Sequence, residues 1–137
     1  MKLLLLLFIP FTALLIWILG CSEPTPKLFR RLLSSETGIT FNNRIQESDS
    51  INILQFEYLY NGGGVGIGDF NNDGLQDVFF TGNQVSCRLY INKGNAQTPS
   101  IQFVDATESA GVTTHVWCTG VTVVDINNDG WQDIYVS

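Results

Sequence analysis

Apolar residues in this chain form one long run near the start and several short runs after it. Residues 3–19 are almost unbroken in their apolar character, whereas the later runs are brief and rich in β-branched and aromatic side chains. Such short runs, separated by glycine, asparagine and proline, are typical of strands joined by turns. We expect strands over residues 51–60, 76–81, 88–92 and 101–105. Because no long helical period lies between them, the pattern predicts an all-β fold.

Two further stretches of this pattern need separate interpretation. Residues 28–33 are apolar and basic and predict one or two helical turns before Gly38. A glycine run at residues 62–64 continues through Gly66 and Gly68, which suggests a phosphate-binding loop. The glycine spacing is wrong for such a loop, and aspartates follow where a helix N-terminus is required. We therefore interpret these glycines as an inner strand that packs closely against its neighbour.

The pattern then repeats. Residues 64–81 align with residues 120–137 without a gap, and nine of the eighteen positions are identical. A weaker similarity links residues 36–40 with residues 109–113. Self-similarity at such a period predicts stacked units that cannot bury their faces alone. About four strands fit between the two copies, which is the content of one β-propeller blade.

Each copy contains a nine-residue stretch with an unusual arrangement of oxygen-bearing side chains. Residues 69–77 read Asp-Phe-Asn-Asn-Asp-Gly-Leu-Gln-Asp, and residues 125–133 read Asp-Ile-Asn-Asn-Asp-Gly-Trp-Gln-Asp. A calcium ion takes about six to eight oxygen ligands, and alternate residues of a tight loop can supply them. The glycine stands where the loop must turn sharply. The candidate ligands are Asp69, Asn71, Asp73, Asp77 and the Leu75 carbonyl, then Asp125, Asn127, Asp129, Asp133 and the Trp131 carbonyl.

Two alternatives to a calcium loop, a plain turn and an EF-hand, fit these stretches less well. Asn-Gly and Asp-Gly pairs are ordinary turn signals, but a plain turn does not require the closing aspartate at the ninth position. An EF-hand needs a glutamate at its twelfth position, where this chain has Phe80 and Val136. The residues after each loop are strand formers, which excludes the flanking helices of an EF-hand. Calcium loops between strands are the preferred interpretation.

The charge, the single histidine and the cysteines limit which classes of function the chain can have. Seven basic and thirteen acidic residues give a net charge of −6, and six of the acids are the loop aspartates. The acidity is therefore local, and no basic cluster suits nucleic acid. His115 is the only histidine, and no nucleophile-base set is evident, so binding is expected rather than catalysis. Whether Cys87 and Cys118 form a disulfide is left open.

The first residues have the pattern of a secretory signal. Lys2 precedes the apolar run, which ends in Ile18-Leu19-Gly20-Cys21. This ending resembles a bacterial lipobox, which implies that residues 1–20 are removed and that Cys21 is lipidated. Residues 21–35 then form the linker. The alternative is an uncleaved membrane anchor, because about 18 apolar residues nearly span a bilayer. We expect an exported lipoprotein at the outer membrane or cell surface, or facing the periplasm.

Residues 64–77 and 120–133 resemble the FG-GAP/VCBS repeat of integrin-α-like β-propellers. Residues 89–95 and 103–107 resemble the secreted bacterial members, including those with an ASPIC/UnbV-type C-terminal domain. The resemblance implies a calcium ion in each inter-strand loop and a propeller of about seven four-stranded antiparallel blades. Residues 36–137 are then an incomplete propeller, and we expect the chain to be the N-terminal part of a longer protein.

These expectations combine into one leading hypothesis and two alternatives. The leading hypothesis is a membrane-anchored, calcium-binding β-propeller module that binds an extracellular protein or a glycan. The first alternative is the N-terminal part of a propeller enzyme that acts on polysaccharide, with catalytic residues beyond residue 137. The second is a purely structural spacer made of further repeats.

Overall fold

A computed structural model of the chain describes residues 28–94 and 101–137, of which Leu32–Ser137 make up one compact unit. The predicted signal peptide and Cys21 lie outside the described residues. A single helical turn precedes six short strands: α2 (Ser34–Thr37), β1 (Val65–Gly68), β2 (Asp77–Phe80), β3 (Arg88–Asn92), β4 (Phe103–Asp105), β5 (Val121–Val124) and β6 (Asp133–Val136). Within these described residues, no helix is long and apolar enough to cross a membrane.

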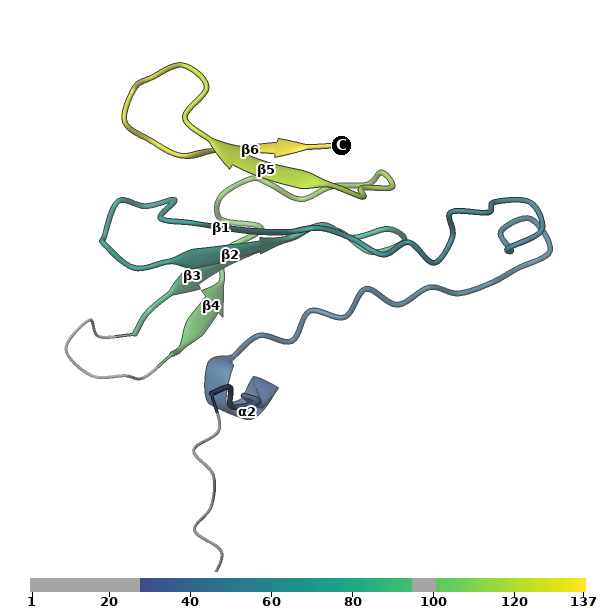
Figure 1. Cartoon of the computed structure of the whole chain (residues 1–137), viewed down its shortest axis with the longest axis horizontal. Helices are drawn as coiled ribbons and strands as arrows, with labels where there is room; N and C mark the ends of the chain where they lie inside the picture. The colour runs from purple at the N-terminus through teal and green to yellow at the C-terminus, as the bar shows by residue number, and fades with distance from the viewer. Residues whose placement is uncertain (1–27, 95–100) are drawn as a thin grey trace, which may run out of the picture. The chain divides into compact units, whose positions relative to one another are not determined.

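The strands form two antiparallel sheets (Figure 1). In the first, β1, β2, β3 and β4 lie in chain order, so each strand pairs with the next one. In the second, β5 pairs with β6 in the register that β1 has with β2: Val121 faces Val136 as Val65 faces Phe80. The architecture is a partial β-propeller, with one four-stranded blade and the first hairpin of another, and it confirms the predicted all-β fold.

One face of the first sheet packs against the second sheet. Alternate residues of β2 and β3 point to this face, where Phe79, Leu89 and Ile91 are buried together with Cys87 and Cys118. From the second sheet, Val121, Ile134 and Val136 pack against this cluster. The period of two along each strand therefore places apolar side chains between the sheets.

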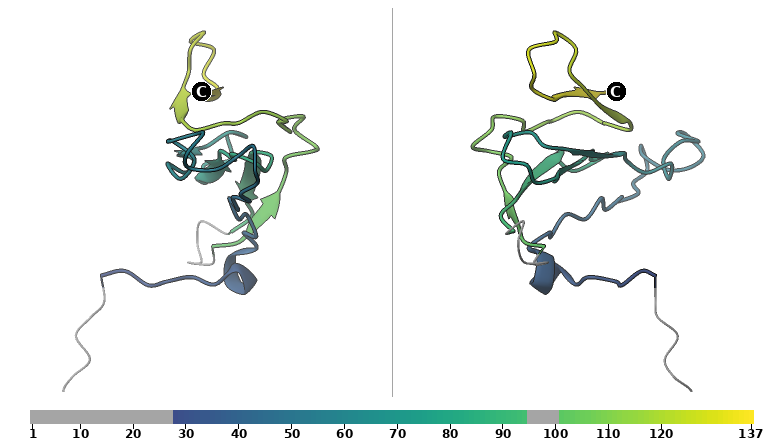
Figure 2. Two further views of the ribbon diagram at one scale, coloured as in Figure 1. Left: turned by 90° about the vertical axis from the view of Figure 1, so that its right-hand side faces the viewer. Right: turned by 60° about the vertical axis from the view of Figure 1, so that its left-hand side comes forward.

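Glycine brings the two sheets into close contact at β1 and β5, which lie side by side in Figures 1 and 2. A Cβ atom on Gly66 would lie 3.0 Å from the Val123 side chain. A Cβ on Gly68 would collide with the carboxamide oxygen of Gln132. The predicted role of these glycines, an inner strand with a closely packed neighbour, is confirmed.

The opposite face of the first sheet is covered by the segment that follows α2. The ring of Phe41 stacks on that of Phe80, with centroids 5.0 Å apart and planes inclined by 15°. Tyr90 contacts the same Phe80 ring edge-on at 5.9 Å, and its hydroxyl accepts the Thr40 backbone N–H at 3.3 Å. Tyr90 is buried, so its ring serves packing and hydrogen bonding within the blade.

Two predicted elements are wrong. Residues 51–60 form consecutive turns instead of a strand, because the Asn52 side chain accepts the backbone N–H groups of Leu54 and Gln55. Asparagine favours such turns by replacing a backbone acceptor. The helical turn expected at residues 28–33 begins instead at Ser34 and ends at Gly38, whose φ is 79°. The Glu36 carboxylate accepts the Leu33 N–H at 2.8 Å and fixes this start.

Candidate metal centre

The two acidic stretches form the loops between β1 and β2 and between β5 and β6, as predicted (Figure 1). Their backbones take the same turns. Asn72 and Asn128 have φ of 55° and 59°, and Gly74 and Gly130 have φ of 84° and 88°. Asparagine and glycine are the residues that adopt this left-handed conformation most readily. The repeated sequence therefore specifies one loop conformation twice.

Inside the first loop, the side chains at the first and third positions converge. An Asp69 carboxylate oxygen and the Asn71 amide oxygen accept the same Asp73 backbone N–H, at 3.0 and 3.1 Å. The other Asp69 oxygen accepts the Gly74 N–H at 2.8 Å. Asp73 in turn accepts the Leu75 N–H at 2.9 Å. These bonds hold three oxygen-bearing side chains on backbone N–H groups of the loop.

The second loop repeats these hydrogen bonds one for one. The Asp129 N–H is shared by Asp125 and Asn127, both at 3.1 Å. Asp125 also accepts the Gly130 N–H, and Asp129 accepts the Trp131 N–H, each at 2.9 Å. The Trp131 bond, followed by a bond from the Asn127 side chain, lowers the pKa of Asp129 and keeps this carboxylate ionised.

The closing aspartates have a structural role as well. Both oxygens of the buried Asp77 accept backbone N–H groups, one from Phe70 at 3.0 Å and one from Asn92 at 2.8 Å. Burial raises the pKa of Asp77, and the charges of Asp73 and Asp69 add to this rise, whereas the two hydrogen bonds oppose it. In the second loop Asp133 is only half-buried and accepts the equivalent Ile126 N–H at 3.0 Å.

Among residues 28–94 and 101–137, no three His, Cys, Asp or Glu side chains come close enough together to hold a metal ion. In both loops the carboxylates accept N–H groups of their own loop. The donor set still suits calcium, because carboxylate, amide and carbonyl oxygens are the ligands this hard cation prefers. The carbonyls of Leu75 and Trp131 accept no hydrogen bond from any described residue, and so both are free to coordinate.

Sequence reasoning missed the residue that joins the loops. The Gln132 carboxamide oxygen accepts the backbone N–H of Asp69, the first residue of the neighbouring loop, at 2.7 Å. The Asn72 side chain donates to the Gly130 carbonyl at 3.5 Å and adds a weaker contact. Glutamine occupies the eighth position of both loops, and this identity was the available signal. The loops are thus coupled mainly through the Gln132 side chain, with the Asn72 contact in addition.

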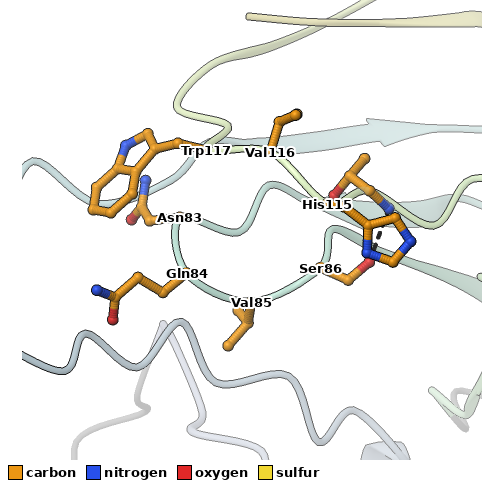
Figure 3. Close-up of a pocket in the computed structure, with 8 residues that line it drawn as sticks. Asn83, Gln84, Val85, Ser86, His115, Val116 and Trp117 are labelled. Atoms are coloured by element: carbon orange, nitrogen blue, oxygen red, sulfur yellow. Dashed lines mark hydrogen bonds between the residues drawn. The ribbon is translucent and has the colours of Figure 1, made fainter.

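A hollow of about 380 Å³ lies elsewhere, between the β2–β3 connection and the segment that leads to β5 (Figure 3). Residues 83–86 and 114–117 line it. Its amide groups serve the fold: Asn83 donates to the carbonyls of Gly62 and Cys118, and Gln84 donates to Gln46. His115 is exposed on the rim.

The two described cysteines are buried free thiols. Burial raises the pKa of Cys118, and the neighbouring Cys87 thiol raises it further. Both belong to the core between the sheets.

The segment that contains both loops matches a known protein family. Residues 69–136 match the FG-GAP-like repeat, from the first aspartate of the first loop to the last residue of β6. No curated protein and no solved structure is significantly similar to the chain.

Proposed function

We propose that this chain, whose residues 69–136 form an FG-GAP-like repeat, is a calcium-braced β-propeller module that binds an extracellular protein or glycan. FG-GAP-like repeats build β-propeller modules of the extracellular binding type, and the partial propeller agrees with that class. The observation that supports the calcium proposal is the repeated loop geometry: two distant stretches share left-handed backbone angles at equivalent positions and hold the same oxygen-bearing side chains in the same hydrogen bonds.

In this proposal each loop holds one ion through its aspartates, its asparagine and one carbonyl. Asp69, Asn71, Asp73, Asp77 and the Leu75 carbonyl hold the first ion; Asp125, Asn127, Asp129, Asp133 and the Trp131 carbonyl hold the second. When bound, a divalent cation neutralises carboxylates that otherwise repel one another. Because each loop connects two paired strands, ion binding stabilises the hairpin at its connecting loop.

Isothermal titration of the full chain with calcium tests this proposal. We expect two bound ions, and each of Asp73→Asn and Asp129→Asn removes one of them. At a calcium concentration of about 100 times Kd, each site adds roughly 2.7 kcal/mol to the free energy of unfolding. Glu57→Gln, an exposed change outside both loops, is the matched control. A titration without heat, and a melting temperature that EDTA does not change, contradict the calcium role.

We also propose that the module is exported and tethered through a lipid on Cys21, on the basis of the lipobox-like ending Ile18-Leu19-Gly20-Cys21. Mass spectrometry of the membrane-extracted chain is expected to detect a diacylglyceryl adduct on Cys21 as the mature first residue. Cys21→Ser removes the adduct and blocks processing. Detection of Met1 on a membrane-embedded wild-type chain contradicts lipidation and supports the uncleaved anchor.

A further inference from the structure

The two described cysteines lie on neighbouring segments, Cys87 at the end of the β2–β3 connection and Cys118 on the segment that leads to β5. These two segments run side by side in Figure 3. The Gly82 carbonyl accepts the Cys118 N–H at 3.0 Å, and the Thr114 hydroxyl oxygen accepts the Cys87 N–H at 2.9 Å. The Asn83 side chain also donates to the Cys118 carbonyl, at 3.0 Å. Hydrogen bonds to both cysteine backbones therefore hold the two residues in place.

Both cysteine side chains are buried in the same core. Cys87 is fully buried and Cys118 is 3% exposed, and both belong to the cluster that contains Phe79 and Leu89. Burial raises the pKa of the Cys118 thiol most, and the Cys87 thiol raises it further through a short-range contact. The two sulfur atoms are therefore neighbours inside the core.

We infer that Cys87 and Cys118 form a disulfide when the chain meets an oxidising compartment. The presence of this disulfide in the cell rests on the proposed export, because exported chains meet oxidants whereas cytosolic thiols are kept reduced. A disulfide is apolar enough to remain in the core that holds both thiols. Among residues 28–94 and 101–137, no third metal-binding side chain joins these cysteines, so a metal site does not compete for them.

The reaction is a thiol–disulfide exchange with the disulfide of an exported oxidase or of oxidised glutathione. One cysteine thiolate attacks a sulfur atom of the oxidant, which releases one thiol and leaves a mixed disulfide. The second cysteine thiolate then attacks the cysteine sulfur of the mixed disulfide and releases the other thiol of the oxidant. The chain loses two protons and two electrons, the disulfide of the oxidant becomes two thiols, and one S–S bond forms. Because both thiols are buried, the exchange takes place before folding or when the unit opens.

The disulfide connects the two repeats covalently. It closes residues 88–117 into a loop that contains β3 and β4, and it fastens the first sheet to the segment that enters the second. Such a cross-link stabilises the folded unit, because it restricts the unfolded chain.

Refolding in a defined redox buffer tests the inference. The full chain carrying Cys21→Ser is unfolded in urea and refolded with oxidised and reduced glutathione, EDTA and non-ionic detergent. Trypsin cuts after lysine and arginine, which leaves the two cysteines on the peptides 45–88 and 94–137. We expect mass spectrometry to find these peptides joined before treatment with dithiothreitol and separate after it. The joined form is expected to persist in a roughly tenfold excess of reduced glutathione.

Thermal unfolding gives a second readout on the same samples. The oxidised chain is expected to melt roughly 10 °C or more above the chain kept in dithiothreitol, which retains the two free thiols. Cys87→Ala and Cys118→Ala each abolish the joined peptides and make the melting temperature insensitive to dithiothreitol. Glu57→Gln, an exposed change outside the core, keeps both effects. The comparison of the unsubstituted cysteines with and without dithiothreitol stands even where a variant fails to fold. Free thiols, glutathione adducts or links between two chains after refolding overturn the inference.

A measurement in cells separates the disulfide from the proposed function. Free thiols of the wild-type chain are blocked with N-ethylmaleimide during lysis in urea, and the digest is expected to contain the joined peptides. Joined peptides after refolding together with blocked thiols from cells support the disulfide and contradict the proposed export. Because the refolding is carried out in EDTA, a failure of calcium binding changes neither result.

Discussion

At the scale of single residues, backbone N–H groups and aspartate oxygens determine most of the loop structure. Asp77 is the clearest case, because its buried carboxylate accepts two N–H groups, one from its own loop and one from β3. Its sequence position indicated a metal ligand. Its bond to Asn92 was invisible in the sequence, since it depends on how β3 lies beside β2.

Asp77→Ala is expected to lower the free energy of unfolding by about 2–4 kcal/mol in EDTA, because two partly buried N–H groups lose their acceptor. Asp133→Ala is the matched variant, and it costs less because Asp133 is half-buried and accepts only one such bond. Urea unfolding, monitored by circular dichroism, measures the loss of stability in both variants. Equal losses for the two variants contradict a structural role specific to Asp77.

Asp105 provides a pH-dependent test outside the loops. Burial raises its pKa, but hydrogen bonds from Thr107 and the neighbouring Arg88, whose guanidinium lies 3.2 Å away, outweigh this effect and lower it. A folded-state pKa below the unfolded value adds stability above the unfolded pKa, about 3.9, and this stability is lost as pH falls through the folded pKa.

We therefore expect the urea midpoint of wild type to fall more steeply below about pH 4 than that of Asp105→Asn. At neutral pH the variant is less stable, by roughly 1 kcal/mol. Glu108→Gln, an exposed neighbour, is the control. Parallel pH profiles for wild type and Asp105→Asn contradict a lowered pKa of Asp105 in the folded state.

At the scale of elements, strands next to strong turn signals were predictable, and segments shaped by local side-chain bonds were not. The runs at 76–81, 88–92 and 101–105 contain β2, β3 and β4 because each of these runs of strand formers pairs with a neighbouring strand. Residues 51–60 have equally good strand formers but no partner strand, so the Asn52 turn prevails. The loop conformation followed from the repeated Asn-Asp-Gly, whereas the Gln132 bond required the relative placement of two sheets.

Gly66 and its equivalent Thr122 form a matched pair for the packing of β1 on β5. Gly66→Val is expected to cost about 1–3 kcal/mol, because the added methyl groups collide with Val121 and Val123. Thr122→Val, on the exposed side of β5, stays within about 0.5 kcal/mol of wild type. Denaturant unfolding at low protein concentration compares them, and a neutral Gly66→Val rules out close packing at this position.

At the scale of the whole molecule, the two sheets share one core. Phe79, Leu89 and Ile91 come from the first sheet and pack with Cys118 and the apolar side chains of β5 and β6. Neither sheet buries its apolar face without the other, as expected for repeat units. The described unit should therefore unfold in a single cooperative step.

The reactivity of the two buried thiols tests whether the described unit unfolds in one cooperative step. In a Cys21→Ser background, Cys87 and Cys118 are expected to react with a thiol reagent only as fast as the whole unit opens, because both lie in the shared core. Burial also raises the Cys118 pKa, which disfavours the reactive thiolate. Labelling that outpaces global unfolding, measured by mass spectrometry across urea concentrations, contradicts a single shared core.

The glutamine at the eighth loop position has an evolutionary consequence. The residues that connect neighbouring loops, Gln132 and Asp69, both occupy positions of the repeated segment. Duplication of the 56-residue period that separates Asp69 from Asp125 therefore adds a repeat together with the residues that contact the next one. A gene of this kind grows by whole modules without inventing new contacts.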